Sequence, residues 1–317
     1  MIKYHIKTVN NISIRGSLNV SKEEFFEFCM RYNLFVIDIC EGGNMSFYNL
    51  CLNKFWVYVV NRFLEGQSLG QTFYSYIVNL DTKNKDLGIC FLFYTDKGFS
   101  LSDVVYKYIK VFSYFDFLIL HYAELKGDYV KAIYSILDYL EMKKTIKFKL
   151  NLLLIPIILT LLCFIYLGFG SVGYFIVALA MISGIILLSI NKKMFSLFIF
   201  SVPVISDFFK NYYSLLFFES LYYLVNHGVP IGESFRCAGM ETDNYFYSFI
   251  GQDISQRFLQ GENLNSLFDK YVQYLDFGFH IPYLFDKDNS FIKGIKNTSN
   301  LAFSLVNILY LKVSLIL

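Results

Sequence analysis

The side chains best placed to do chemistry are two carboxylates, Glu124 and Asp128, which stand four residues apart. On one face of a helix such a pair could bind a cation, but Gly127 lies between them and predicts a turn. We therefore favour a structural interpretation, in which Asp128 caps the start of the next helix and Glu124 contacts a cap or a partner. His121 and His227 are more typical of packing or capping positions than of metal ligands.

The sequence contains none of the common catalytic motifs. There is no G-x-x-x-x-G-K-[ST] phosphate loop, no G-x-S-x-G nucleophile turn and no H-E-x-x-H metal pair. The six cysteines form no C-x-x-C pair, and the four histidines show no short ligand spacing, so neither set predicts a metal site. We expect a protein that is not an enzyme and that has no cofactor and no metal.

Charge and composition narrow the class of partner. The chain of 317 residues has 28 basic and 26 acidic side chains, a balance of +2 that argues against a nucleic-acid partner. It is 55% hydrophobic and only 17% charged, whereas soluble domains carry about 25% charged residues. The sequence therefore argues against a purely soluble protein.

Much of the low content of charged residues comes from one segment. Leu150 to Ile190 contains no Asp, Glu, Lys or Arg. As one helix this run would be roughly 60 Å long, about twice the hydrocarbon thickness of a bilayer. It predicts a transmembrane hairpin with spans near 150–168 and 172–190. Lysines on both sides predict cytoplasmic flanks that contact phospholipid. These lysines are Lys143, Lys144, Lys147, Lys149, Lys192 and Lys193.

Outside this run the apolar residues recur at helical spacing, as at Val130, Ile133, Leu137 and Leu140. We expect an all-α membrane protein with two homologous cytoplasmic helical bundles, separated by the transmembrane hairpin and followed by an apolar C-terminal helix. Whether the last segment completes a third span stays open. The expected parts are an N-terminal region at 1–54, the first bundle at 55–149, the hairpin at 150–190, the second bundle at 191–300 and a short or truncated transmembrane helix at 301–317.

The two predicted bundles share a sequence pattern. Residues 66–73 match residues 228–235 at a shift of 162, as G-x-[SP]-[LI]-G-[QE]-x-F, and residues 98–101 match residues 261–264 at a shift of 163. Each match predicts a helix that ends at a glycine and a short turn into the next helix. Two matches in the same order favour an internal duplication. The residues that we expect to shape these turns or contact partners are Gly66, Gly70, Gly98, Glu124, Gly127, Asp128, Pro203, Gly228, Pro230, Gly232 and Gly261.

The order of these motifs resembles the platform proteins of type IV pilus assembly and type II secretion, the F-type secretion family, and most of all its type IVb pilus branch. A proline-led turn at Pro203 and a helix closing on Gly228-Val-Pro230 resemble the entry into the family's second domain. The segments at Gly98 and Gly261 resemble its glycine-led short helix. Residues 123–128 resemble its acidic turn before the helix that leads into the membrane. The resemblance extends from about residue 55 to the end of the chain.

The resemblance implies a platform that couples a cytoplasmic assembly ATPase to the insertion of pilins into a fibre. It implies a multi-pass protein of the bacterial inner membrane with a cytoplasmic N-terminus. The implied partners are the assembly ATPase, pilins, other inner-membrane assembly proteins, the phospholipid bilayer and further copies of the chain. The alternatives are a small polytopic transporter, which predicts polar residues at mid-membrane, and a membrane scaffold unrelated to pili, which does not explain the repeat.

Overall fold

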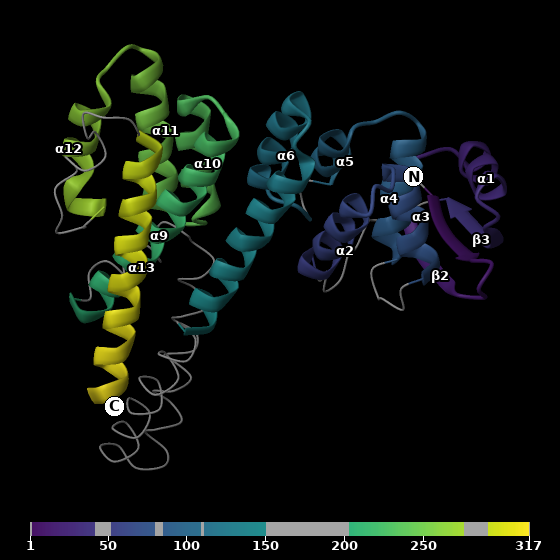
Figure 1. Cartoon of the computed structure of the whole chain (residues 1–317), viewed down its shortest axis with the longest axis horizontal. Coiled ribbons are helices and arrows are strands. Elements are labelled where there is room, and N and C mark those ends of the chain that lie inside the picture. The colour runs from purple at the N-terminus through teal and green to yellow at the C-terminus, as the bar shows by residue number, and fades with distance from the viewer. Residues whose placement is uncertain are drawn as a thin grey trace. The chain divides into compact units, whose positions relative to one another are not determined.

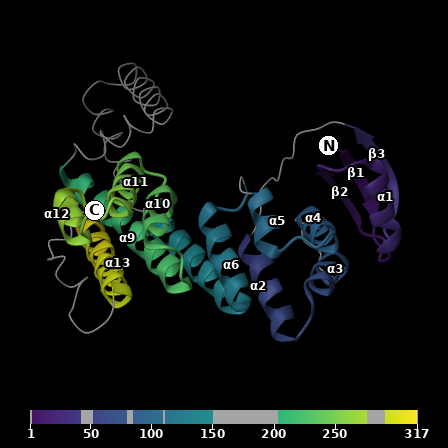
Figure 2. The same ribbon diagram turned by 90° about the horizontal axis from the view of Figure 1, so that it is seen from above.

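A computed structural model describes residues 2–41, 52–79, 85–108, 111–149, 203–275 and 291–316. The chain divides into two compact units, Met1–Asp138 and Tyr139–Leu317. Figures 1 and 2 show the elements of both units in two views. A helix at 129–149 contributes residues to each unit.

The first unit begins with a small antiparallel sheet and one helix, in the order β1 (Ile2–Lys7), β2 (Ser13–Leu18), α1 (Lys22–Arg31) and β3 (Phe35–Glu41). β1 lies between β2 and β3. Along β1 every second residue, Ile2, Tyr4 and Ile6, is buried, which is the period of a half-buried strand. The prediction of an all-α fold is therefore wrong. The sequence interpretation left 1–54 unassigned and missed this short alternation.

Helices make up the rest of the first unit, and two of them begin at capping boxes. Ser100 accepts a hydrogen bond from the backbone of Asp103, whose side chain accepts one in return, and Ser113 and Asp116 repeat this arrangement. These reciprocal bonds fix where α5 and α6 start. The helices are α2 (Leu52–Leu64), α3 (Leu69–Asn79), α4 (Lys85–Asp96), α5 (Leu101–Lys107), α6 (Tyr114–Lys126) and the helix at 129–149.

The sheet is held against these helices by contacts between α1 and the end of α4. The rings of Phe28 and Phe93 lie 5.1 Å apart. Asp96 accepts hydrogen bonds from Arg31 at 2.5 Å and from Tyr32 at 2.8 Å. The aromatic contact excludes water, and the carboxylate fixes the orientation, so the sheet and the helices form one unit.

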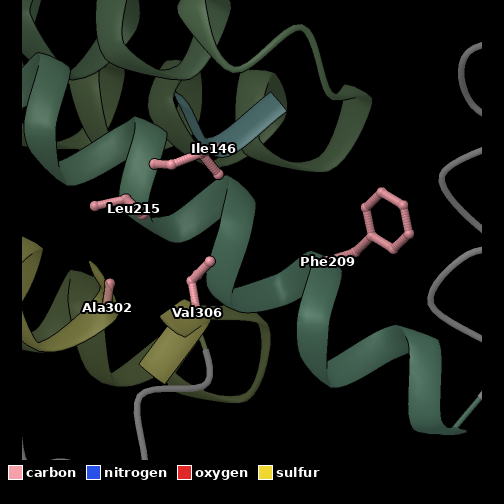
Figure 3. Packing of buried hydrophobic residues seen from close by; sticks show 5 residues of the cluster. All are labelled: Ile146, Phe209, Leu215, Ala302 and Val306. Carbon is pink, nitrogen blue, oxygen red and sulfur yellow. The ribbon is translucent and has the colours of Figure 1, made fainter. Parts of the chain in front are cut away.

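The second unit is helical in its described part. It contains the end of the helix at 129–149, and the helices α9 (Pro203–His227), α10 (Ile231–Glu241), α11 (Tyr245–Leu259), α12 (Leu264–Leu275) and α13 (Phe291–Ile316). One buried cluster joins three of these helices (Figure 3). Its residues are Ile146 from the helix at 129–149, Phe209 and Leu215 from α9, and Ala302 and Val306 from α13.

Glycines with a left-handed backbone end helices in both units. In the described residues their φ values lie between +73 and +90°. At each one the N–H of the following residue donates to a carbonyl five residues back, as from Gln67 to Arg62 and from Val229 to Leu224, both at 3.0 Å. This is the Schellman geometry, which favours glycine because a Cβ is disfavoured at positive φ. The glycines are Gly66, Gly98, Gly127, Gly228 and Gly261.

The core positions of the two units also correspond. Phe55 and Phe73 lie 6.1 Å apart between α2 and α3, and their counterparts in the repeat, Phe217 and Phe235, lie 6.3 Å apart between α9 and α10. All four rings are fully buried. The shift that relates these rings is the one that relates Gly66 to Gly228, so the match in sequence is accompanied by a match in packing.

α10 and α11 approach closely at two glycines. A Cβ on Gly251 would lie 2.4 Å from the carbonyl oxygen of Phe235 and 2.9 Å from the Cα of Gly239. In the first unit Gly88, at a shift of 163 from Gly251, lies on α4, where a Cβ would lie 2.7 Å from the Tyr76 ring of α3. The close approach of these helix pairs therefore requires glycine on the second helix of each.

Across the described residues, no helix has both the length and the apolar character needed to cross a membrane. This finding contradicts the multi-pass inner-membrane localisation and the transmembrane helix at 301–317. The physical reason is visible in α13, which carries Lys293 and Lys296 and packs against α9. The predicted hairpin at 150–190, with Lys192 and Lys193 after it, lies outside the described residues.

Replacing Gly251 by Ala should destabilise the second unit by about 1–3 kcal/mol, because the new methyl group would collide with backbone atoms. Thermal and urea unfolding of the full chain would measure the loss. Gly70→Ala is the matched control, since no atom beyond the adjoining backbone of its own helix lies within 4 Å of a Cβ at that position. It should leave stability unchanged or raise it by about 0.5–1 kcal/mol. Equal unfolding curves for the two variants would contradict the close helix contact.

Candidate functional site

A cavity of about 350 Å³ lies between two helix corners of the first unit. One corner joins α2 to α3, and the other joins α6 to the helix at 129–149. We refer to this cavity as the groove. It brings together three of the residues singled out in the sequence, Gly66, Gly127 and Asp128. Its lining residues are Phe63, Gly66, Gln67, Leu69, Gly127, Asp128, Tyr129 and Val130.

Local sequence chemistry builds both corners of the groove. Gly66 ends α2 with a φ of +79°, and Ser68 with Gln71 then forms a reciprocal pair of hydrogen bonds that starts α3. Gly127 ends α6 with a φ of +73°, and the Asp128 carboxylate accepts a 3.4 Å hydrogen bond from the backbone of Lys131. Asp128 therefore occupies the capping position expected from the sequence.

The lining of the groove combines apolar side chains with polar groups in similar measure. The rings of Phe63 and Tyr129 lie 6.3 Å apart. Burial raises the pKa of the Tyr129 hydroxyl, and the negative charge of Glu124 raises it further, so this hydroxyl stays protonated at neutral pH. The side-chain oxygen of Gln67 is buried and accepts no hydrogen bond within the described part of the chain.

Two exposed leucines stand in the helix turns that lead into these corners. Leu64, in the last turn of α2, is 60% exposed, and Leu125, in the last turn of α6, is 72% exposed. A cavity with both apolar and polar lining, at corners whose preceding helix turns expose leucines, has the composition of a site for a protein side chain.

Glu124 and His121 make contacts that hold neighbouring parts of the first unit together. The Glu124 carboxylate accepts hydrogen bonds from the backbone N–H of Ser102, at 2.8 Å, and from the Ser102 hydroxyl. It therefore ties the start of α5 to the end of α6. The His121 ring stacks on Phe117 at 5.6 Å. His227, at the end of α9, is buried.

The other proposed residues lie outside the groove. In the first unit Gly70 is in the first turn of α3, and Gly98 follows α4. The remaining ones belong to the second unit, at the start of α9, at the corner between α9 and α10, and between α11 and α12. They are Pro203, Gly228, Pro230, Gly232 and Gly261.

Two of the predicted membrane-flanking lysines have partners within the protein. Lys143 donates to the Glu241 carboxylate at 2.6 Å, and Lys149 donates to the side-chain oxygen of Asn307 at 2.6 Å. These contacts tie the helix at 129–149 to α10 and α13. Lys144 and Lys147 are exposed.

The sequence did not single out one buried carboxylate that the structure shows to be paired. Glu219 on α9 accepts a hydrogen bond from Lys296 at 2.6 Å and another from the Ser299 hydroxyl, both on α13. Its side chain is 8% exposed. Lys296 and Ser299 share one helix face, which is the signal that the sequence offered. Their acceptor lies on a helix far away in the chain, so a single sequence could not identify it.

Replacing Glu219 by Gln should lower the free energy of unfolding by about 1–3 kcal/mol, since it leaves the Lys296 ammonium without its counter-charge. The matched control is Glu262→Gln in the same unit, which removes the exposed pair with Arg257 and should cost less than about 0.5 kcal/mol. Urea unfolding of both variants makes the comparison. A Glu219 variant as stable as the control would show that the buried pair does not fasten α13.

No protein-family model matches this sequence, and no curated protein matches it. The function is therefore inferred from the residues and from the geometry described above.

Proposed function

We propose that the chain is a non-catalytic platform component of a type IV pilus assembly or type II secretion machine, in which the two units of the chain link an assembly ATPase to pilins. The observation that carries this proposal is the repeat. The glycine-closed corners at Gly66 and Gly98 correspond to those at Gly228 and Gly261, and both units have a buried Phe–Phe contact between consecutive helices. The order of motifs that resembles the F-type secretion family supports the same function.

A component that transmits force must keep its shape while its partners move. Short glycine-closed corners, such as those at Gly66 and Gly228, leave little freedom between consecutive helices. Buried aromatic cores pack at high density and resist deformation. These features of each unit favour the stiffness that a mechanical link requires.

The groove is the surface at which we expect a protein partner to bind the first unit. Interfaces depend on a few apolar or aromatic anchors that fill pockets. The groove offers such a pocket, lined by Phe63, Leu69 and Val130. A helix or loop of the assembly ATPase that inserts one apolar side chain would fit this chemistry.

The double substitution Leu64→Glu/Leu125→Glu should abolish fibre assembly or secretion at a normal cellular level of the protein, because it places two charges in the helix turns that lead into the corners of the groove. The matched control is Val9→Glu/Met30→Glu, which changes two apolar residues of similar exposure, one between β1 and β2 and one on α1. We expect the control to assemble normally. Surface pili, or the secreted substrate, would be quantified in cells that carry each variant. Normal assembly with the groove variant would exclude the groove as the partner site.

The proposal also predicts which residues tolerate conservative change. Glu124→Gln keeps an acceptor for Ser102, and His121→Gln keeps a polar group of similar size, so both variants should retain assembly. Gly228→Val should weaken assembly through stability, because it forces a β-branched residue to positive φ at a cost of about 1–3 kcal/mol. Fibre counts and protein levels would be measured together. If Glu124→Gln or His121→Gln abolished fibre assembly at the full protein level while Gly228→Val did not, the result would indicate a chemical site.

A further inference from the structure

The sheet of the first unit has one covered face and one exposed face. Ile2, Tyr4 and Ile6 of β1 are buried, and the Tyr4 ring contacts Phe25 of α1 at 4.8 Å. α4 lies against the same face near Gly16, where Asp86 approaches β2. The opposite face, which we call the outer face, is left open by these helices.

Strand register identifies the residues of the outer face, because directly paired residues point to the same side of a sheet. Lys3 pairs with Ser17 and Cys40, His5 pairs with Arg15 and Asp38, and Lys7 pairs with Ser13 and Phe35. Three basic side chains therefore share one small surface.

These three cations have no carboxylate partner within the described part of the chain: the ion pairs found there involve none of Lys3, Lys7 and Arg15. Asp38, the acidic residue on this face, accepts a hydrogen bond from the Cys40 thiol at 3.3 Å. That bond and the nearby negative charge raise the pKa of the Cys40 thiol, so the thiol stays neutral and leaves the positive charge of the face in place. The outer face thus attracts negative charge.

The same strand pair also exposes apolar surface. Phe35, opposite Lys7, is 62% exposed, and Ile37 is 49% exposed at the point where the register of β1 and β3 shifts. An exposed aromatic next to these cations provides an anchor in addition to charge attraction.

We propose that the outer face binds an acidic segment of a partner protein, whose carboxylates pair with Lys3, Lys7 and Arg15 while an apolar side chain packs on Phe35. The mixed chemistry of the face favours a protein. Asp38 would repel a uniformly anionic lipid surface or a phosphate backbone, whereas a protein segment can present a donor to it and to Ser13 and Ser17. This surface is built by different elements from the groove, so the inference stands independently of the proposed function.

A photo-crosslinking residue at Ser17 in the full chain, expressed in its own cells, tests the proposal. Mass spectrometry of the crosslinked peptide should identify one protein and a segment rich in Asp and Glu. The crosslink yield should fall about tenfold in Lys3→Glu/Arg15→Glu, because each reversal places like charges together. Lys54→Glu/Lys131→Glu, which makes the same charge change at two exposed helical lysines, should leave the yield unchanged. Replacing the partner's acidic residues by Lys should restore crosslinking to Lys3→Glu/Arg15→Glu.

Several outcomes would overturn the proposal. These are the absence of a protein crosslink, a segment without acidic residues, and a yield that is insensitive to Lys3→Glu/Arg15→Glu. Binding of the purified full chain to vesicles of equal parts phosphatidylglycerol and phosphatidylcholine provides a further check. If that binding fell with Lys3→Glu/Arg15→Glu but not with the control pair, the outer face would be a lipid-binding surface instead. Circular dichroism of each variant would verify that the sheet is retained.

Discussion

The constraint on which the rest of the structure depends is the left-handed glycine at the ends of its helices. A residue with positive φ lets the chain leave a helix and close two hydrogen bonds back onto its last turn. Because these exits are short, the next helix begins within a few residues and packs against the one before it. Gly66 and Gly127 build the two corners that enclose the groove, and Gly228 sets the equivalent corner in the second unit.

Given these corners, the packing of each unit follows from residue size. Bulky rings fill the spaces between consecutive helices, as at Phe55 and Phe73, while glycine is kept where two backbones meet, as at Gly239 and Gly251. Two of the carboxylates inside the second unit are paired with lysines. Glu219 with Lys296 and Glu241 with Lys143 each tie helices that are distant in sequence. Among the described residues, the groove and the outer face of the sheet each leave polar groups available to partners.

The features that could be predicted from the sequence are local ones. A glycine between two apolar helical patterns indicates a helix end, and an Asp after such a glycine indicates a cap, as Gly127 and Asp128 illustrate. The sheet was not predicted because the alternation of buried and exposed residues in β1 is short. Aromatic residues, which favour strands, are common throughout the chain and so did not mark these strands out. The transmembrane assignment of 301–317 failed because the apolar residues there extend a helix whose first half is polar and whose buried side packs on α9.

Contacts between residues far apart in the chain could not be predicted from a single sequence. Neither the Glu219–Lys296 pair nor the meeting of two corners at the groove leaves a periodic signal, because each joins segments that are far apart in the chain. The outer face of the sheet is a similar case. Lys3, Lys7 and Arg15 come together only through the register of β1 and β2.

The central claim is that this chain is a structural link in an assembly machine. The most direct test is to delete its chromosomal copy and to count surface pili by electron microscopy, with secreted protein measured in the same cultures. The account predicts that the deletion removes pili or secretion, that the full chain supplied in trans restores them, and that pilin and the assembly ATPase stay at normal levels throughout. Unchanged pili and unchanged secretion in the deletion strain would contradict it.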